Sequence, residues 1–345
     1  MRLGGSVPGG KSLTWKKLDP SEGHPPESRS SFSISYHYCS KQAFLYGGKN
    51  NEGSEFDDKM YSLTIHQTEE RSVQVKWKVL GDCSGSHSPG LISGHSSVCV
   101  GDKLYIFGGK NKDGRYLNSL YQMDTKTNGW SEVKTTGQQP QPRTDHAITS
   151  VGTRIYLFGG EGENGLLNDL YLFDVDNKTW QKMPTGRTTP SGRHGAALLG
   201  MRNTNDDGDL LCLMFGTGKD AIMDDMFTYS TITKEWYDRP SKGQLCHGRS
   251  YFFSSLLMAG KILIFGGTST LATQEGGPQN DSFVYNVLGG NWSKLHQAGD
   301  EPGHMPTPRS HMAGFKHGGD GFVVYGGLDS AGKTLGDLWY ATIGK

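Results

Sequence analysis

Arginine and histidine side chains stand at matching points along the chain, and these residue types can bind anionic groups. An arginine guanidinium is planar and carries five N–H donors, which suits a carboxylate. One hypothesis is therefore a pocket for an acidic or C-terminal peptide segment of a partner protein, with no catalytic residue and no metal. The candidate partner-binding residues are Arg29, His95, Arg143, His146, Arg193, His194, Arg249, Arg309 and His311.

The same residues have a structural alternative. Each arginine could donate hydrogen bonds to loop carbonyls of the next unit of the fold, and each histidine could cap a turn. In most units the arginine stands just before a segment of small residues, as Arg193 stands before 194–199, whereas the second unit has Gly94 and His95 there. Both interpretations remain open from the sequence.

Other arrangements that could support catalysis are missing from the sequence. It contains no Gly-rich phosphate loop followed by Lys and Ser or Thr, and no Gly-x-Ser-x-Gly motif. The 12 histidines are scattered and do not form a metal-ligand motif on a helix. We therefore expect a protein that is not an enzyme and holds no cofactor.

The elements that position these residues form a repeat marked by tryptophan. The clearest copy is an apolar segment, 154–158, followed by Gly159-Gly160, then Asn168-Asp169-Leu170-Tyr171, then Trp180. A period of about 40–60 residues with strand-like segments indicates a stacked or closed repeat architecture. The equivalent tryptophans are Trp15, Trp77, Trp130, Trp180, Trp236 and Trp292.

The ends of the chain complete one another in this pattern. The last unit stops after its third strand, near Ile343, while the chain begins with a strand around Trp15 that matches the strand around Trp292. We therefore expect the N-terminal strand to complete the last unit and close a ring, which leaves no long exposed sheet edge.

The order of apolar segment, Gly-Gly, spacer, Tyr and Trp resembles the kelch repeat, over residues 13–343. The resemblance implies an all-β fold: a six-bladed kelch-type β-propeller with four antiparallel strands per blade. It predicts one propeller over residues 13–345, preceded by a flexible tail over 1–12. The arginines and histidines would then cluster at one end of the central channel.

The kelch resemblance implies a binding module, because propellers of this kind recognise proteins through a loop-rich face. Scaffold, trafficking effector and substrate adaptor are the expected roles. Plant specifier proteins, which are iron-dependent kelch propellers, are the alternative, but their Glu, Asp and His at four-residue intervals are missing from 268–280, where Glu275 stands alone. The loops that differ most between units, and so carry specificity, are 49–57, 110–117, 161–167, 219–223, 268–279 and 328–335.

The bulk composition narrows the class of partner. Lys and Arg number 35 and balance 35 Asp and Glu, so no basic surplus favours nucleic acid. The sequence has no apolar segment of about 20 residues that could span a membrane, and no apolar leader. Five cysteines without a Cys-x-x-Cys pair fit a cytoplasmic or nuclear protein. No oligomerisation segment precedes the repeats, so we expect a monomer.

Overall fold

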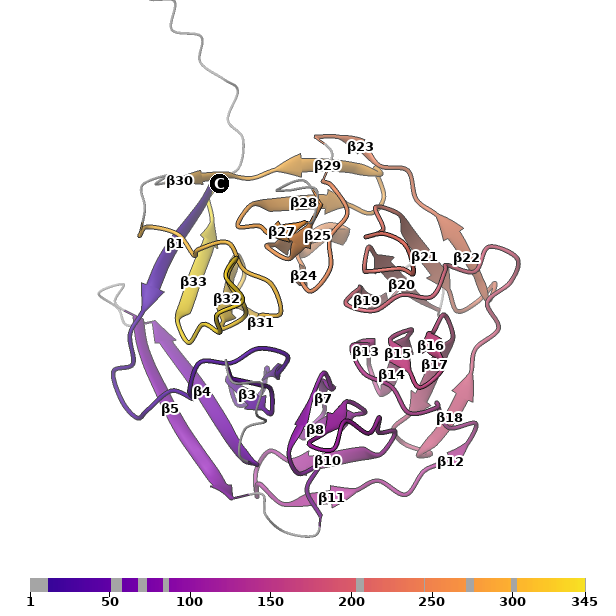
Figure 1. The fold of residues 1–345 in the computed structure, drawn as a ribbon, viewed down its shortest axis with the longest axis horizontal. Helices are drawn as coiled ribbons and strands as arrows, with labels where there is room; N and C mark the ends of the chain where they lie inside the picture. Colours follow the sequence, from indigo (N-terminus) through magenta and orange to yellow (C-terminus); the bar gives the residue numbers. More distant parts are fainter. Residues whose placement is uncertain are drawn as a thin grey trace, which may run out of the picture.

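The fold is a ring of six β-sheets around a central channel, as the computed structural model shows (Figure 1). The structure describes residues 12–50, 58–67, 73–82, 87–202, 208–244, 246–270, 276–298 and 303–344. Each sheet is one blade, and its first strand lies at the channel while its fourth lies at the rim. The predicted tail over residues 1–12 lies outside the described residues except for Ser12, which begins a strand.

Each blade has four antiparallel strands, as the repeat predicts. Blades 1 and 2 comprise β2 (Ser33–His37), β3 (Gln42–Tyr46), β4 (Lys59–Gln67), β5 (Val73–Asp82), and β7 (Ser96–Val100), β8 (Lys103–Phe107), β10 (Leu120–Asp124), β11 (Trp130–Glu132). Blades 3 and 4 comprise β13 (Ala147–Val151), β14 (Arg154–Phe158), β17 (Leu170–Asp174), β18 (Thr179–Lys182), and β19 (Ala197–Arg202), β20 (Asp209–Met214), β21 (Met226–Ser230), β22 (Glu235–Asp238). Blades 5 and 6 comprise β24 (Phe253–Leu256), β25 (Lys261–Phe265), β28 (Ser282–Asn286), β29 (Asn291–Lys294), and β31 (Ala313–His317), β32 (Gly321–Tyr325), β33 (Leu338–Ile343), β1 (Ser12–Leu18).

Shorter elements join or cover the blades. Three of them run parallel to a fourth strand at the rim: β12 (Thr136–Gly137), β23 (Lys242–Gly243) and β30 (His296–Ala298). Three small hairpins or pairs lie in the loops: β6 (Ile92–Ser93) with β9 (Lys110–Asn111), β15 (Glu161–Gly162) with β16 (Gly165–Leu166), and β26 (Thr268–Ser269) with β27 (Gly277–Pro278). One 3-10 turn, η1 (Met258–Gly260), lies between β24 and β25.

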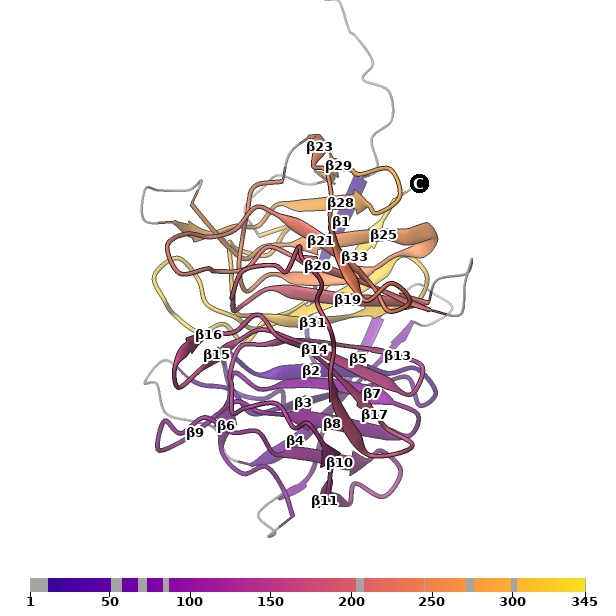
Figure 2. The same ribbon diagram turned by 90° about the vertical axis from the view of Figure 1, so that its right-hand side faces the viewer.

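The ring closes through the N-terminal strand, as the sequence predicts. β1 pairs antiparallel with β33 from Leu13 opposite Ile343 to Leu18 opposite Leu338. The first and last strands of the chain therefore lie side by side in blade 6 (Figure 1). The side view in Figure 2 again shows β1 close to β33.

The repeated tryptophans bind neighbouring blades together. Each one packs against the aromatic residue at the end of the second strand of the preceding blade, or directly after it for Phe215, with ring centroids 4.6 Å apart for Trp15 and Phe265 and 5.2 Å apart for Trp180 and Phe107. The other pairs are Trp77–Tyr325, Trp130–Tyr46, Trp236–Phe158 and Trp292–Phe215. Because a buried aromatic ring removes about 150–250 Å² from water, this contact in every blade supplies much of the force that holds the ring together.

The second strands form the most apolar part of the core. Ile155, Leu157, Leu211 and Leu263 are fully buried in them, which fits strands that are covered on both faces by neighbouring blades. No helix in the described residues is long and apolar enough to cross a membrane. The four described cysteines, Cys39, Cys99, Cys212 and Cys246, are free thiols.

Candidate functional site

Six residues form a closed ring of main-chain hydrogen bonds at one end of the channel, and we call this ring the collar. In each of its six hydrogen bonds, the N–H of one residue donates to the carbonyl of its counterpart in the preceding blade, at 2.8–3.3 Å. All six have a positive φ between 53° and 65°. The collar residues are Ser31, Gly94, Asp145, Gly195, Tyr251 and His311. Because the ring fixes their backbone, it also fixes the direction of any side chain at these positions.

An aromatic group covers the blade 4 to blade 6 side of the collar. The hydroxyl of Tyr251 lies 2.5 Å from Nδ1 of His194. The Tyr251 ring stacks on His311 with centroids 3.6 Å apart. It also lies over Gly195, where an added Cβ would approach the ring to 3.0 Å. The three half-buried side chains therefore form one rigid platform at the channel mouth.

Charged groups gather on the opposite side of the same mouth. Asp145 of the collar interacts with Lys110, Glu161 and Lys49, the residues that follow the Gly-Gly pairs of blades 1 to 3. Nζ of Lys110 lies 4.0 Å from Glu161 and 4.3 Å from the centre of the Tyr116 ring. Burial raises the pKa of Asp145 to about 6, although the hydrogen bond from Thr144 and the charge of Lys110 oppose the rise.

The histidines of the predicted site occupy two different environments. His194 and His311 belong to the mouth, where burial lowers the pKa of both imidazoles, that of His311 to about 4. His95 and His146 lie below the collar between blades, at the positions held by Phe32, Phe252 and Met312 in other units. Both are buried and neutral, since burial lowers the pKa of His95 to about 3 and that of His146 well below its usual value. These two histidines act as interior packing residues.

The predicted arginines lie inside the blades. Nη1 of Arg143 donates to Oδ1 of Asp169 at 2.6 Å and to the carbonyl of Gly159 at 2.9 Å, all within blade 3. The guanidinium also lies over the Tyr171 ring, 5.5 Å from its centre. The same arrangement joins Arg193 to Asp225, Arg249 to Asp281 and Arg309 to Asp337. Arg29 donates to Gly47 in the equivalent way.

This placement corrects the hypothesis that the guanidinium groups line a partner pocket. The side chains of Arg29, Arg143, Arg193, Arg249 and Arg309 are at most 1% exposed. A partner could reach them only by breaking the ion pairs, which would leave a buried charge without compensation. The arginines therefore have the structural role that the sequence left open as the alternative. The hydrogen bonds of each arginine stay within a single blade, the one whose first strand follows that arginine.

Blade 2 lacks both members of this ion pair. The carbonyl of Ile92 accepts from Gly48 as that of Arg143 accepts from Gly109, so Ile92 occupies the arginine position. Ser119 occupies the aspartate position by the same criterion, because its carbonyl accepts from Gly108 as that of Asp169 accepts from Gly159. Blade 2 thus has an uncharged residue at both the arginine and the aspartate position, as expected if the two charged residues form a structural pair.

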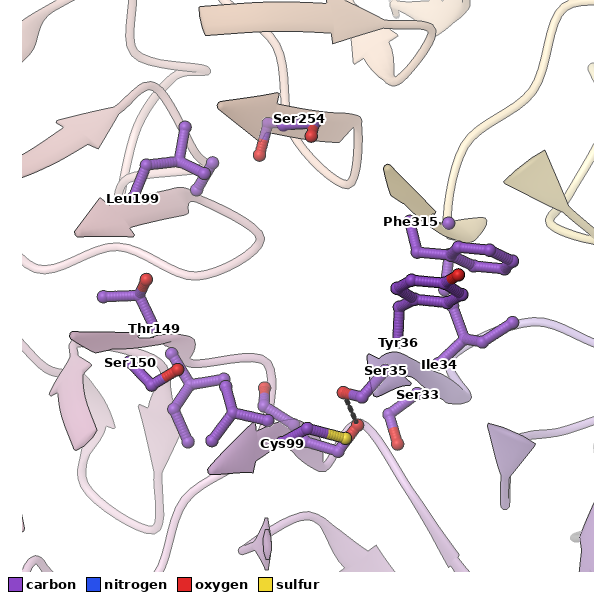
Figure 3. Close-up of a pocket in the computed structure, with 18 of the residues that line it drawn as sticks. Ser33, Ile34, Ser35, Tyr36, Cys99, Thr149, Ser150, Leu199, Ser254 and Phe315 are labelled. Carbon is purple, nitrogen blue, oxygen red and sulfur yellow. Dashed lines mark hydrogen bonds between the residues drawn. The ribbon is translucent and has the colours of Figure 1, made fainter. Parts of the chain in front are cut away.

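A wider cavity of about 670 Å³ continues along the first strands below the collar. Hydroxyl groups line much of it, including those of Ser35, Thr149, Ser150 and Ser254 (Figure 3). Ser35 shares a 2.8 Å hydrogen bond with Ser97, and Tyr36 stacks on Phe315 at 5.0 Å. The described residues contain no cluster of three or more His, Cys, Asp or Glu side chains suited to a metal ion.

Asp145 and Tyr251 are not among the site residues predicted from the sequence, whereas Lys110 and Glu161 begin the loops 110–117 and 161–167, which the sequence predicts to carry specificity. A signal for the collar residues exists in the repeat, because three of the six equivalent positions hold Ser or Gly, whereas the other three hold Asp145, Tyr251 and His311. Departure from the repeat at a fixed position therefore identifies the mouth better than residues that recur in most units.

Replacement of Asp145 by Asn tests the electrostatics of the mouth. The folded protein binds the proton of the Asp145 carboxyl group more tightly than the unfolded chain does. The stability that this protonation adds is therefore complete below about pH 4 and is lost as the pH rises to about 6. Asn also tolerates a positive φ. We expect Asp145→Asn to stabilise the protein by about 1–2 kcal/mol at pH 8, a figure discounted for partial exposure, and by nearly nothing at pH 4. Urea unfolding at both pH values measures this, and an equal effect at both would contradict it.

Comparison with known proteins agrees with the fold and with the repeat. The KLHDC2/KLHL20/DRC7 Kelch-repeats domain matches residues 74–267, more than half of the chain. Acyl-CoA-binding domain-containing protein 4 of Arabidopsis thaliana is 27% identical over 83% of this chain and 41% of its own length. Human host cell factor 2 is 26% identical over 95% of this chain and 44% of its own.

A third curated relative and one solved structure complete the comparison. Kelch domain-containing protein 3 of Bos taurus is 27% identical over 72% of this chain and 64% of its own length. The chain thus spans less than two thirds of the length of each of these curated relatives. The solved structure of YjhT superposes with a TM-score of 0.68 at 17% identity, covering 94% of this chain and 99% of its own, and it supports the fold alone. The repeat, the closed six-bladed ring and the family match together show that this chain belongs to the kelch-repeat family of β-propellers.

Proposed function

We propose that this propeller is a non-catalytic binding module whose protein partner docks on the loop-rich face around the collar. The observation that carries the proposal is the concentration of side chains that depart from the repeat at the channel mouth. Tyr251, His194 and His311 offer a rigid aromatic platform on one side, while Asp145 and Lys110 offer charge on the other.

Rigid aromatic residues beside a few charged groups are typical of the residues that dominate protein interfaces. The platform is already in place without a partner, so little side-chain entropy remains to be lost when a partner binds. The kelch relatives named above support a role in protein interaction, and the roles of scaffold, trafficking effector and substrate adaptor all fit this single face. A cytoplasmic or nuclear location and a monomeric state are part of the same proposal.

Replacing Tyr251 by Gly tests the proposal. Glycine is native at the equivalent collar positions 94 and 195, so the change removes the platform without straining the backbone. Truncation of an interface hot spot costs about 2 kcal/mol or more, so we expect the amount of captured partner to fall by at least about tenfold in quantitative affinity purification.

Met258→Ala is the matched control, because Met258 is exposed on the turn between the first and second strands of blade 5, at the other end of the channel. Its capture of the partner should equal that of the wild type. Equal capture by the Tyr251 and Met258 variants would exclude the collar face as the docking site. Thermal unfolding of both variants confirms that any loss is not caused by misfolding.

A further inference from the structure

The larger side chains of the collar are arranged in one regular way, in which each lies over the collar residue of the preceding blade. The ring of His311 stacks on that of Tyr251, which in turn lies over Gly195. The carboxyl group of Asp145 lies over Gly94, where an added Cβ would stand 3.1 Å from its Oδ1. A side chain at position 195 would by the same arrangement lie over Asp145, and glycine leaves that place empty.

A hollow of about 140 Å³ lies at the collar. Asp145, Gly195 and Tyr251 line it and follow one another around the ring in that order, from blade 3 to blade 5. The volume is several times the space that one water molecule needs, so the hollow has room for the charged end of a long side chain.

The electrostatic environment of the hollow is negative beside Tyr251. Burial raises the pKa of the Tyr251 hydroxyl well above its usual value, and the negative charges of Asp145 and Glu161 raise it further. Both carboxylates come from blade 3, one from the collar and one from the loop that follows the Gly-Gly pair. An acidic segment of a partner would therefore meet like charges here, whereas a cation would be attracted.

The lysines of the protein compensate Asp145 only in part. The charges of Lys110 and Lys49 lower the pKa of its carboxyl group, yet burial raises that pKa to about 6. Nζ of Lys110 lies 4.0 Å from the Glu161 carboxylate and 4.3 Å from the centre of the Tyr116 ring, so Asp145 is not its nearest partner. Within the part of the chain that the structure describes, no lysine or arginine forms an ion pair with Asp145.

Asp145 and Tyr251 both weaken the free protein. Each has a φ of 53°, and a left-handed conformation costs a tyrosine about 1–2 kcal/mol. The ionised Asp145 carboxylate is disfavoured at neutral pH, because burial removes water from its charge. Residues that lower stability at a channel mouth indicate binding, because a ligand of opposite charge would offset what the free protein loses.

We propose that this hollow binds the positively charged end of a lysine or arginine side chain of the partner, between the Asp145 carboxylate and the Tyr251 ring. The N–H groups of the cation donate to the carboxylate in charge-assisted hydrogen bonds, and the tyrosine ring adds a cation–π attraction. The inference rests on the function proposed above, since it names the chemistry of the partner residue at the same face.

Four capped pentapeptides, which differ only in the central residue between glycines, are the test ligands. The lysine and arginine peptides should bind the wild-type protein with a Kd of about 1 mM in a titration followed by NMR, and should shift the amide signals of Asp145 and Tyr251. The peptide with acetylated lysine, which has the same stem without the charge, should bind at least about tenfold more weakly. The glutamate peptide should not bind.

The protein variant Asp145→Asn removes the charge and keeps the shape of the side chain. Its affinity for the lysine peptide should fall at least about tenfold, because a neutral amide replaces the carboxylate. Asp220→Asn is the matched control, since Asp220 is exposed on the loop between the second and third strands of blade 4, on the same face. It loses the same charge away from the hollow, and its affinity should stay within about twofold of the wild type.

Any of three results would overturn the proposal: no binding at several millimolar lysine peptide, equal or tighter binding of the acetylated or glutamate peptide, or unchanged binding by Asp145→Asn. Partner capture separates this inference from the function on which it rests. Asp145→Asn should reduce capture at least about tenfold, as Tyr251→Gly does. Loss of capture by Tyr251→Gly alone would keep the docking face and remove the cation, whereas normal capture by Tyr251→Gly would remove the docking face itself.

Discussion

Deletion of residues 1–18 is expected to destabilise the whole propeller, not only its first strand. The deletion removes β1, which pairs with β33 at six positions from Leu13 to Leu18. It also removes Trp15, which is 6% exposed and packs on Phe265 of blade 5 and Phe322 of blade 6. Replacing one buried tryptophan costs about 3–5 kcal/mol, and here a whole strand is lost as well. Because total stability is about 5–15 kcal/mol, we expect a protein that is unfolded or melts far below the wild type.

The matched control is deletion of residues 1–11, which leaves β1 complete. Its melting temperature should equal that of the full chain, as expected for the tail that the sequence predicts. Trp15→Ala provides an intermediate case with a single cooperative transition at lower temperature. A deletion of 1–18 with an unchanged melting profile would show that the ring does not depend on closure by β1.

The six-bladed ring could be predicted from the sequence because its signal is repeated in every unit. The Gly-Gly pairs of five units, the landmark tryptophans and the incomplete units at the two ends are all visible in the local sequence spacing. The partner of each tryptophan could not be read in this way. Phe107 and Trp180 meet across two blades, and only the packing of one sheet on the next brings them to 5.2 Å.

The site was predicted less well than the fold for a related reason. The arginines recur because their hydrogen bonds hold the blade together, with an ion pair to aspartate in blades 3 to 6, so their recurrence marks structure. The residues at the mouth come from different blades and share a position in the repeat but not a residue type: Asp145 and Tyr251 each lie two residues after the arginine of their blade. The hydrogen bond from Tyr251 to His194 joins residues 57 positions apart and could not be inferred from their spacing.

Removing one member of the arginine–aspartate pair should lower the free energy of unfolding far more than removing both members. Asp169→Ser leaves Arg143 charged, fully buried and without its carboxylate, which is expected to cost about 3–5 kcal/mol. Arg143→Ile with Asp169→Ser installs the pair that blade 2 already contains in Ile92 and Ser119. The double variant should lie within about 1–2 kcal/mol of the wild type, since the carbonyls of Gln141 and Gly159 lose a donor while no charge is stranded.

Urea unfolding of the wild type, the two single variants and the double variant completes a double-mutant cycle. The urea concentration at the transition midpoint should change between variants, while the dependence of the unfolding free energy on urea concentration stays the same. This result would show that the stability changed and not the compactness of the folded or unfolded state. Because each single change leaves a charge without its partner and the double change does not, the two single effects together should exceed the effect of the double variant by at least about 2 kcal/mol.

The same four proteins separate the two interpretations of the arginines in one further measurement. If Arg143 is a strut within blade 3, the double variant should capture partner as well as the wild type does, because the collar residues Asp145 and Tyr251 keep their main-chain ring. If Arg143 instead contacts the partner, capture should be lost in the double variant while its stability stays near that of the wild type. Its burial and its hydrogen bonds to Asp169 favour the first outcome.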